Sequence, residues 1–168
     1  QDTLRGSNGE GRRWWDVKHY NLTVYLDPEN KSLSGFNIIR FDVVDKPIDI
    51  MQIDLQDTLV VDSVYVYDFD TVKNSTYKAE VIVSSKKATI VKDGKVWWIH
   101  YGFSKWPVGA NKEVKIYYHG KPRAARTPPW DGGIIWGVDS MGSPWYSVAC
   151  QGLGASSWWP CKDYQADE

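Results

Sequence analysis

The sequence has 168 residues, of which 42% are hydrophobic and 24% charged, and its formal net charge is −1. This length and balance are typical of a single globular domain with a hydrophobic core. Acidic and basic residues are interspersed and no basic run is longer than Arg12-Arg13, so the chain lacks the electrostatic footprint of a nucleic-acid-binding protein. No apolar run approaches the roughly 18 residues that cross a bilayer, which argues against membrane insertion.

The first residues differ in composition from the rest. Residues 1–13 are rich in Gly, Ser, Asn and charge, and we expect a flexible lead-in there, followed by one domain over residues 14–168. Such a start is typical of a chain that has lost a signal segment, and it predicts an extracytoplasmic location, periplasmic or secreted; an arbitrary boundary would look the same. Cys150 and Cys161 are too few for a disulfide framework, and we expect free thiols.

Alternating apolar and polar residues predict strands along most of the domain. Residues 20–27 form the first predicted strand, and the turn sequence at 27–30 leads to a partner strand at 35–44, which makes a hairpin. Further strands are predicted at residues 48–55, 60–67, 78–84, 88–91, 114–119, 132–138 and 144–151.

One turn signal allows the strand register to be predicted as well. Asp93-Gly94 is a strong signal for a two-residue type I′ hairpin turn. That turn would pair Ile90 with Trp97, bury Trp97 and leave Trp98 partly exposed. No long amphipathic helix is predicted anywhere. The expected fold class is therefore all-β, an antiparallel sandwich or saddle rather than a βαβ fold.

Motifs for catalysis are missing from the sequence. The three histidines, His19, His100 and His119, fall in predicted strands, and none belongs to an H-E-x-x-H motif. A Gly-x-Ser-x-Gly motif is absent too. We therefore expect neither a catalytic residue nor a metal site in this chain.

The most informative position is Gln151. Alternation places it at the end of the last predicted strand, where a rigid element would present its amide. An uncharged group that both donates and accepts hydrogen bonds suits a peptide backbone or amino terminus. Gly152 would let a ligand approach the backbone closely. The alternative is that Gln151 caps its own turn and that Gly152 is an ordinary turn glycine.

The ten Trp and ten Tyr residues exceed what a globular domain of this size needs. They suggest a second function, a glycan-binding β-sandwich that uses Trp98, Trp130 or Trp145. A third possibility is a structural interaction domain. In each of the adjacent Trp pairs, at 14–15 and 158–159, we expect one buried ring and one partly exposed ring.

Five short landmarks occur in a distinctive order and spacing along residues 14–168. They are Asp16-Val-Lys-His-Tyr-Asn-Leu-Thr-Val-Tyr-Leu-Asp27, Met51-Gln-Ile-Asp-Leu55, Tyr118-His-Gly-Lys-Pro122, Pro128-Pro-Trp-Asp-Gly-Gly133 before Trp136, and Cys150-Gln151 with Trp159-Pro-Cys-Lys-Asp163. Together they resemble the amino-terminal domain of the aminopeptidase N-like zinc metallopeptidases, the gluzincin group that includes leukotriene hydrolase.

The resemblance implies a saddle-like antiparallel β-sandwich that belongs to a larger enzyme. Zinc and the H-E-x-x-H motif would lie in a thermolysin-like catalytic domain outside this chain, so no cofactor is expected in the chain itself. The partners implied are that catalytic domain and peptide substrates with a free amino terminus.

The resemblance also implies a role for the last strand. Gln151 matches the position from which a Gln or Glu reaches into the active-site cleft and holds the amino end of the substrate. Family members often carry another polar residue two positions earlier, where this chain has Ala149, and the change bears on the preference for the first residue. The implied function is non-catalytic: the domain forms one wall of the cleft, while the missing domain hydrolyses the first peptide bond.

Overall fold

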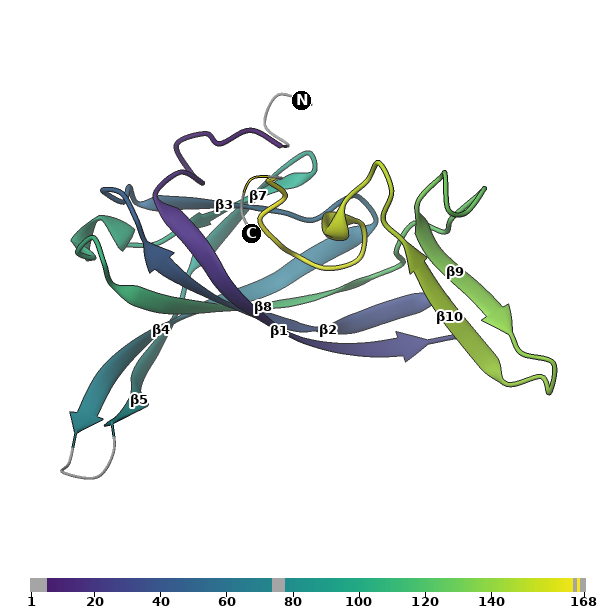
Figure 1. Cartoon of the computed structure of the whole chain (residues 1–168), viewed down its shortest axis with the longest axis horizontal. Coiled ribbons are helices and arrows are strands. Elements are labelled where there is room, and N and C mark those ends of the chain that lie inside the picture. Colours follow the sequence, from purple (N-terminus) through teal and green to yellow (C-terminus); the bar gives the residue numbers. More distant parts are fainter. Residues whose placement is uncertain (1–5, 74–77, 165, 167–168) are drawn as a thin grey trace.

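The computed structural model describes residues 6–73, 78–164 and 166, and it consists almost entirely of antiparallel strands (Figure 1). This confirms the predicted all-β class. The strands are β1 (Trp15–Asp27), β2 (Ser32–Val43), β3 (Ile50–Asp54), β4 (Leu59–Lys73), β5 (Lys78–Lys87), β6 (Thr89–Asp93), β7 (Val96–His100), β8 (Asn111–Gly120), β9 (Gly133–Val138) and β10 (Pro144–Ala149). Among the described residues, no helix has the length and apolar character needed to span a membrane.

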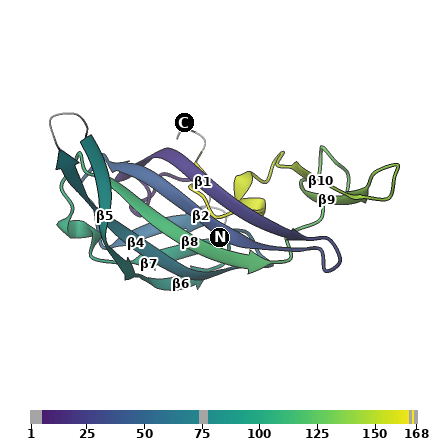
Figure 2. The same cartoon turned by 90° about the horizontal axis from the view of Figure 1, so that it is seen from below.

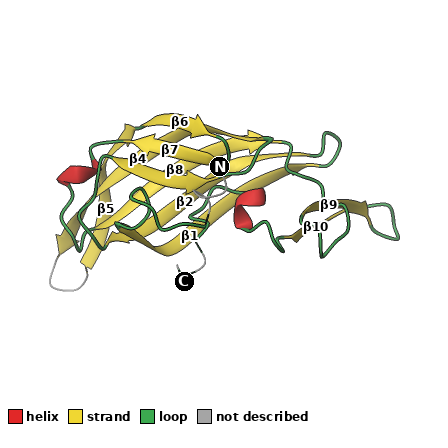
Figure 3. Cartoon of the chain, turned by 90° about the horizontal axis from the view of Figure 1, so that it is seen from above, coloured by secondary structure: helices red, strands yellow, loops and turns green. Residues whose placement is uncertain are grey.

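The strands form three sheets. The largest has five strands in the order β1-β2-β8-β4-β5, the second has the order β3-β7-β6, and the third is the β9–β10 hairpin. The three-stranded sheet lies over one face of the large sheet, and the β9–β10 hairpin stands apart at one end (Figures 1 and 2). Figure 3 shows the same layers from the opposite side, with one single-turn 3-10 helix at one end of the molecule and the other between the main sheets and the β9–β10 hairpin.

The β6–β7 hairpin has the predicted faces but a different register. Ile90 pairs with Ile99 rather than with Trp97, and the two loop residues are Gly94 and Lys95. Gly94 has a φ of 62°, whereas Lys95 is not in the positive-φ region, which is the pattern of a type II′ turn rather than the predicted type I′. The register moves by two residues and so preserves the alternation, and Trp97 is buried as expected.

A cluster of aromatic rings fills one end of the core. Trp14 and Trp15 are both buried, which corrects the expectation that one ring would stay partly exposed. The two rings take different sides of the same apolar region: the Trp14 ring packs 5.2 Å from Phe103, and the Trp15 ring packs 5.4 Å from Phe41. Adjacent residues point to opposite faces only in an extended strand, and Trp14 precedes β1 and lies in a turn.

Part of the predicted lead-in is packed into the domain. The backbone amide groups of Arg12 and Arg13 both donate hydrogen bonds to the Gly9 carbonyl, at 2.9 and 3.0 Å, which forms a tight turn. The Gly11 carbonyl accepts from the backbone of Gln52 at 2.9 Å, and the Arg12 side chain is fully buried. The packed part of the chain thus begins before residue 14, which is the predicted start of the domain.

Candidate functional site

The predicted site residues lie where β10 ends. Ala149 is half-buried and pairs with Gly133, the first residue of β9, so the strand has no partner beyond this point. Gln151 therefore lies in a turn two residues past the end of β10, not on the strand as predicted. Both Gln151 and Gly152 are exposed to solvent.

The turn is made by the backbone. The Cys150 carbonyl accepts hydrogen bonds from the amide groups of Leu153 and Gly154, at 3.1 and 2.8 Å. Gly152 and Gly154 have φ angles of 72° and 73°, a region that favours glycine. The Gln151 carboxamide makes no hydrogen bond to any residue in the described part of the chain. It therefore does not cap its own turn, and its donors and acceptor face solvent.

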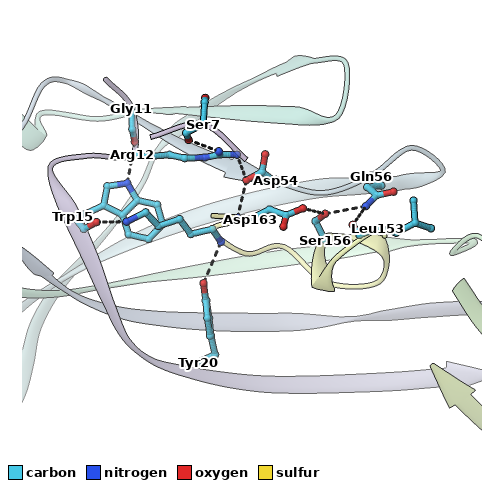
Figure 4. A network of polar contacts seen from close by, with 11 residues as sticks. Ser7, Gly11, Arg12, Trp15, Tyr20, Asp54, Gln56, Leu153, Ser156 and Asp163 are labelled. Carbon is cyan, nitrogen blue, oxygen red and sulfur yellow. Dashed lines mark hydrogen bonds and ion pairs between the residues drawn. The ribbon is translucent and has the colours of Figure 1, made fainter. Parts of the chain in front are cut away.

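A buried amide holds the far side of this turn. The Gln56 side chain donates hydrogen bonds to the Leu153 carbonyl at 2.5 Å and to Ser156 Oγ at 3.0 Å (Figure 4). The Gln56 backbone amide also donates to the Ser156 carbonyl at 2.9 Å. Ser156 Oγ in turn donates to the Asp163 carboxylate at 2.7 Å. The turn that carries Gln151 is thus fixed from Leu153 onward.

A buried ion pair supports the same segment. The Arg12 guanidinium donates to Asp54 Oδ2, and that oxygen also accepts the backbone amide of Asp163 at 3.0 Å (Figure 4). The Asp54 and Cys161 backbones exchange two hydrogen bonds, at 2.8 and 3.1 Å. Burial raises the pKa of Asp54 to about 6, against the opposing attraction of the Arg12 charge.

Trp159 and Lys162 attach the segment to β1. The backbone amide of Lys162 donates to the Tyr20 hydroxyl at 3.1 Å, and Lys162 Nζ donates to the Trp15 carbonyl at 2.5 Å. The Trp159 ring packs edge-on against Tyr20 at 4.7 Å. Trp158 and Trp159 are both partly buried, so the expected division into one buried and one exposed ring does not hold here either.

Within the described ranges, no group of three or more His, Cys, Asp or Glu side chains could hold a metal ion. The residues present thus do not fit a zinc ion, and no chemical step is assigned to them. Cys150 and Cys161 are not joined by a disulfide; Cys161 is buried, and Cys150 is half-buried at the base of the Gln151 turn.

The three tryptophans of the glycan-binding alternative come from separate elements. Trp98 lies on β7 and is half-buried, Trp130 lies between β8 and β9 and is 73% exposed, and Trp145 lies on β10 and is 51% exposed. None of the three belongs to an aromatic ring pair within the described part of the chain.

Comparisons with known proteins rest on structure alone, because no protein-family model and no curated protein matches the chain. The fold is one shared with solved M1 zinc metallopeptidases, which confirms the resemblance at the level of fold.

The particular structures come from two organisms. An M1 zinc metallopeptidase from Deinococcus radiodurans, a mutant bound to a Tyr-Ser-Ala substrate, matches with a TM-score of 0.59 and 18% identity over 94% of this chain and 31% of its own. Another structure from that organism covers 99% of this chain and 33% of its own, with a TM-score of 0.58 and 16% identity. Native yeast LTA4 hydrolase matches with a TM-score of 0.55 and 16% identity over 90% of this chain and 21% of its own. The chain thus spans between a fifth and a third of these structures.

Proposed function

We propose that this chain is the N-terminal domain of a zinc aminopeptidase of the M1 type and that it has no catalytic activity of its own. The shared fold and the small fraction of each matched chain that it covers support this assignment. Zinc and the hydrolytic machinery would then belong to the remaining polypeptide, and the catalytic domain would be the main partner of this one. The predicted extracytoplasmic location stays a prediction, which fractionation of the source cells tests.

In this role Gln151 holds the amino terminus of a peptide substrate. The observation that carries the proposal is its exposed carboxamide, which makes no hydrogen bond within the described residues and is carried by a turn anchored in the core. The Oε1 atom can accept a hydrogen bond from the substrate ammonium group, and the Nε2 atom can donate to a neighbouring carbonyl. Because Gln151 is neutral, the charge that balances the ammonium would come from acids of the catalytic domain.

The neighbouring residues shape the same wall. Gly152 adds no side chain at the tip of the turn, so a substrate can approach its backbone closely. Ala149 places a methyl group where a polar side chain would add a further hydrogen bond. Such a wall contributes orientation: it sets the distance from the amino terminus to the reacting bond and thereby favours removal of a single residue.

The test uses the complete polypeptide that contains this domain. Gln151→Ala should lower kcat/KM for aminoacyl arylamides about 10-fold to 100-fold, since a hydrogen bond to a charged group is lost. Gln151→Glu should recover the loss through a charge-assisted bond to the ammonium. Asn21→Ala removes another exposed amide, on β1, and should change nothing.

Two results would contradict the proposal. Unchanged kcat/KM in Gln151→Ala would remove Gln151 from substrate binding. Turnover of the arylamides by the 168-residue chain alone, in a preparation where Gln151→Ala leaves the rate unchanged, would show that the chain has catalytic machinery of its own.

A further inference from the structure

The outer face of the five-stranded sheet carries a row of aromatic side chains. Phe36 on β2 pairs with Tyr117 on β8, and their rings lie 5.6 Å apart. Tyr65 on β4 lies 6.0 Å from Tyr117, edge to face. Tyr25 on β1 is 65% exposed. The row therefore crosses four neighbouring strands, which lie side by side in Figure 2.

Two adjoining hollows follow this row. One has a volume of about 410 Å³ and is lined by residues that include Tyr25, Ser34 and His119. The other has a volume of about 380 Å³ and shares Tyr25 and Ser34 with the first, while Phe36 and Tyr117 line its other side. Together they form one shallow groove, which we call the outer-sheet groove.

Polar groups accompany the aromatic rings in the outer-sheet groove. His119 Nδ1 and Asp62 Oδ1 lie 2.7 Å apart, and the two side chains are 56% and 43% exposed. Ser34 lies directly opposite His119 in the strand register. The ammonium group of Lys115 lies 3.8 Å from the centre of the Phe36 ring. The groove therefore combines apolar ring surfaces with hydrogen-bonding groups.

We propose that the outer-sheet groove binds a neutral oligosaccharide. A sugar ring offers an apolar face to an aromatic side chain and hydroxyl groups at its rim to carboxylate, imidazole and hydroxyl partners. The formal charges at the groove balance, because Asp27 and Asp62 are matched by Lys121 and Lys115, and this balance suits a neutral ligand and gives no support for a polyanion. A peptide cannot bind over β2 and β8 by adding a strand, because the backbones of these two interior strands pair on both sides.

The site is separate from the Gln151 turn and does not depend on the proposed peptidase role. It also differs from the glycan-binding alternative derived from the sequence, which relied on tryptophans, whereas this groove uses Tyr25, Phe36 and Tyr117. Binding to the outer-sheet groove can therefore fail or succeed without changing the expectation for Gln151.

The experiment is a titration of the full 168-residue chain with cellohexaose, xylohexaose and chitohexaose, followed by calorimetry and by backbone amide NMR shifts. We expect saturable binding of at least one of them, with shifts confined to β1, β2, β4 and β8. Tyr25→Ala should weaken that binding about tenfold, because it removes an exposed stacking ring without removing a core residue. Tyr117→Ala, a second variant in the same groove, should have a similar effect.

The control is Trp130→Ala, which removes another highly exposed aromatic side chain, outside the groove, and should leave the affinity unchanged. The proposal is overturned if none of the three oligosaccharides binds. It is also overturned if binding persists unchanged in both tyrosine variants, if Trp130→Ala abolishes it, or if only an unrelated peptide of similar size binds in a Tyr25-dependent manner.

Discussion

The segment over residues 150–163 and the β9–β10 hairpin are neighbours in the chain, but they are held in opposite ways. Buried polar side chains tie the segment to the core, through Gln56 and Asp54. The hairpin is a two-stranded sheet that stands away from the other sheets (Figure 1), and it exposes Val138 to 70% and Met141 to 88%.

This difference shows which region is stabilised by contacts within the domain. A two-stranded sheet is marginally stable on its own, and grouped exposed apolar side chains are typical of contact surfaces. Gln151 lies at the junction of the two regions, on the first turn after the hairpin. We expect substitutions on the core side of this junction to change the free energy of unfolding strongly, and substitutions in the hairpin to change it little.

The largest effect is expected when the buried ion pair is broken. Asp54→Ala leaves the Arg12 guanidinium buried without a counter-charge and should lower the free energy of unfolding by about 3–5 kcal/mol. Asp57→Ala makes the same change at a residue that is 60% exposed in its pair with Lys92, and should stay within about 0.5 kcal/mol. Urea unfolding measures both. Equal effects would show that the buried pair contributes no more than the exposed one.

The two methionines of the chain allow a direct comparison of the two regions. Met51 is fully buried on β3, the strand that also carries Asp54, whereas Met141 is in the turn of the β9–β10 hairpin. Met51→Ala should destabilise the domain by about 2–5 kcal/mol through lost burial and a new cavity. Met141→Ala should change stability by no more than about 0.5 kcal/mol. A large loss of stability in Met141→Ala would mean that the Met141 side chain makes more contacts than its exposure indicates.

The pH dependence of the free energy of unfolding should reveal the raised pKa of the Asp54 carboxyl. Its pKa rises from 3.8 to about 6 on folding, so the folded state holds this proton more tightly than the unfolded state. Protonated Asp54 therefore stabilises the folded state fully below about pH 4, and this stabilisation is lost as the pH rises to about 6. The free energy of unfolding changes by about 3 kcal/mol through this group. Asp54→Asn lacks the titration, so the difference in unfolding free energy between wild type and this variant should change by that amount. A pH-independent difference would rule out the raised pKa.

The smallest effect is expected at Gln56. Gln56→Ala removes the amide that donates to the Leu153 carbonyl and to Ser156 Oγ, and it should lower the free energy of unfolding by about 1–3 kcal/mol. Its effect should be local, with faster hydrogen exchange at the backbone amides of Leu153 and Gly154. Asn37→Ala removes another buried amide, which donates to Pro160 at 2.9 Å, and should leave the exchange rates of those two amides unchanged. Uniform acceleration across all strands in Gln56→Ala would instead mean global destabilisation without a specific hold on the turn.

The strands could be predicted because side-chain alternation follows burial along most of them. The predicted hairpin at residues 20–27 and 35–44 is observed as β1 and β2. β1 starts five residues earlier than predicted, at Trp15, and a register irregularity between Val17 and His19 interrupts the alternation there. The predicted register of the β6–β7 hairpin was wrong, because the glycine of an Asp-Gly pair can take either central position of a two-residue turn.

The support of the candidate site could not be predicted in the same way. Gln52 and Asp54 alternate with Met51 and Ile53, which is also the pattern of a strand with one face in water. In the structure both faces of β3 are buried. Its polar residues, Gln52 and Asp54, form hydrogen bonds with chain segments from the two ends of the sequence. Alternation reports where apolar side chains lie, but it does not reveal that distant segments cover the polar face.

The partnership of Arg12 with Asp54 also bears on how the domain can be shortened. A truncation that starts at Trp14 would retain every strand and the whole aromatic cluster. It would nevertheless remove Arg12 and leave the buried Asp54 carboxylate without its counter-charge. It would also weaken the attachment of the segment that binds Asp54 through the Asp163 backbone amide. The folding unit therefore extends further toward the amino terminus than the first strand does, and its natural edge is set by a charge rather than by an element of secondary structure.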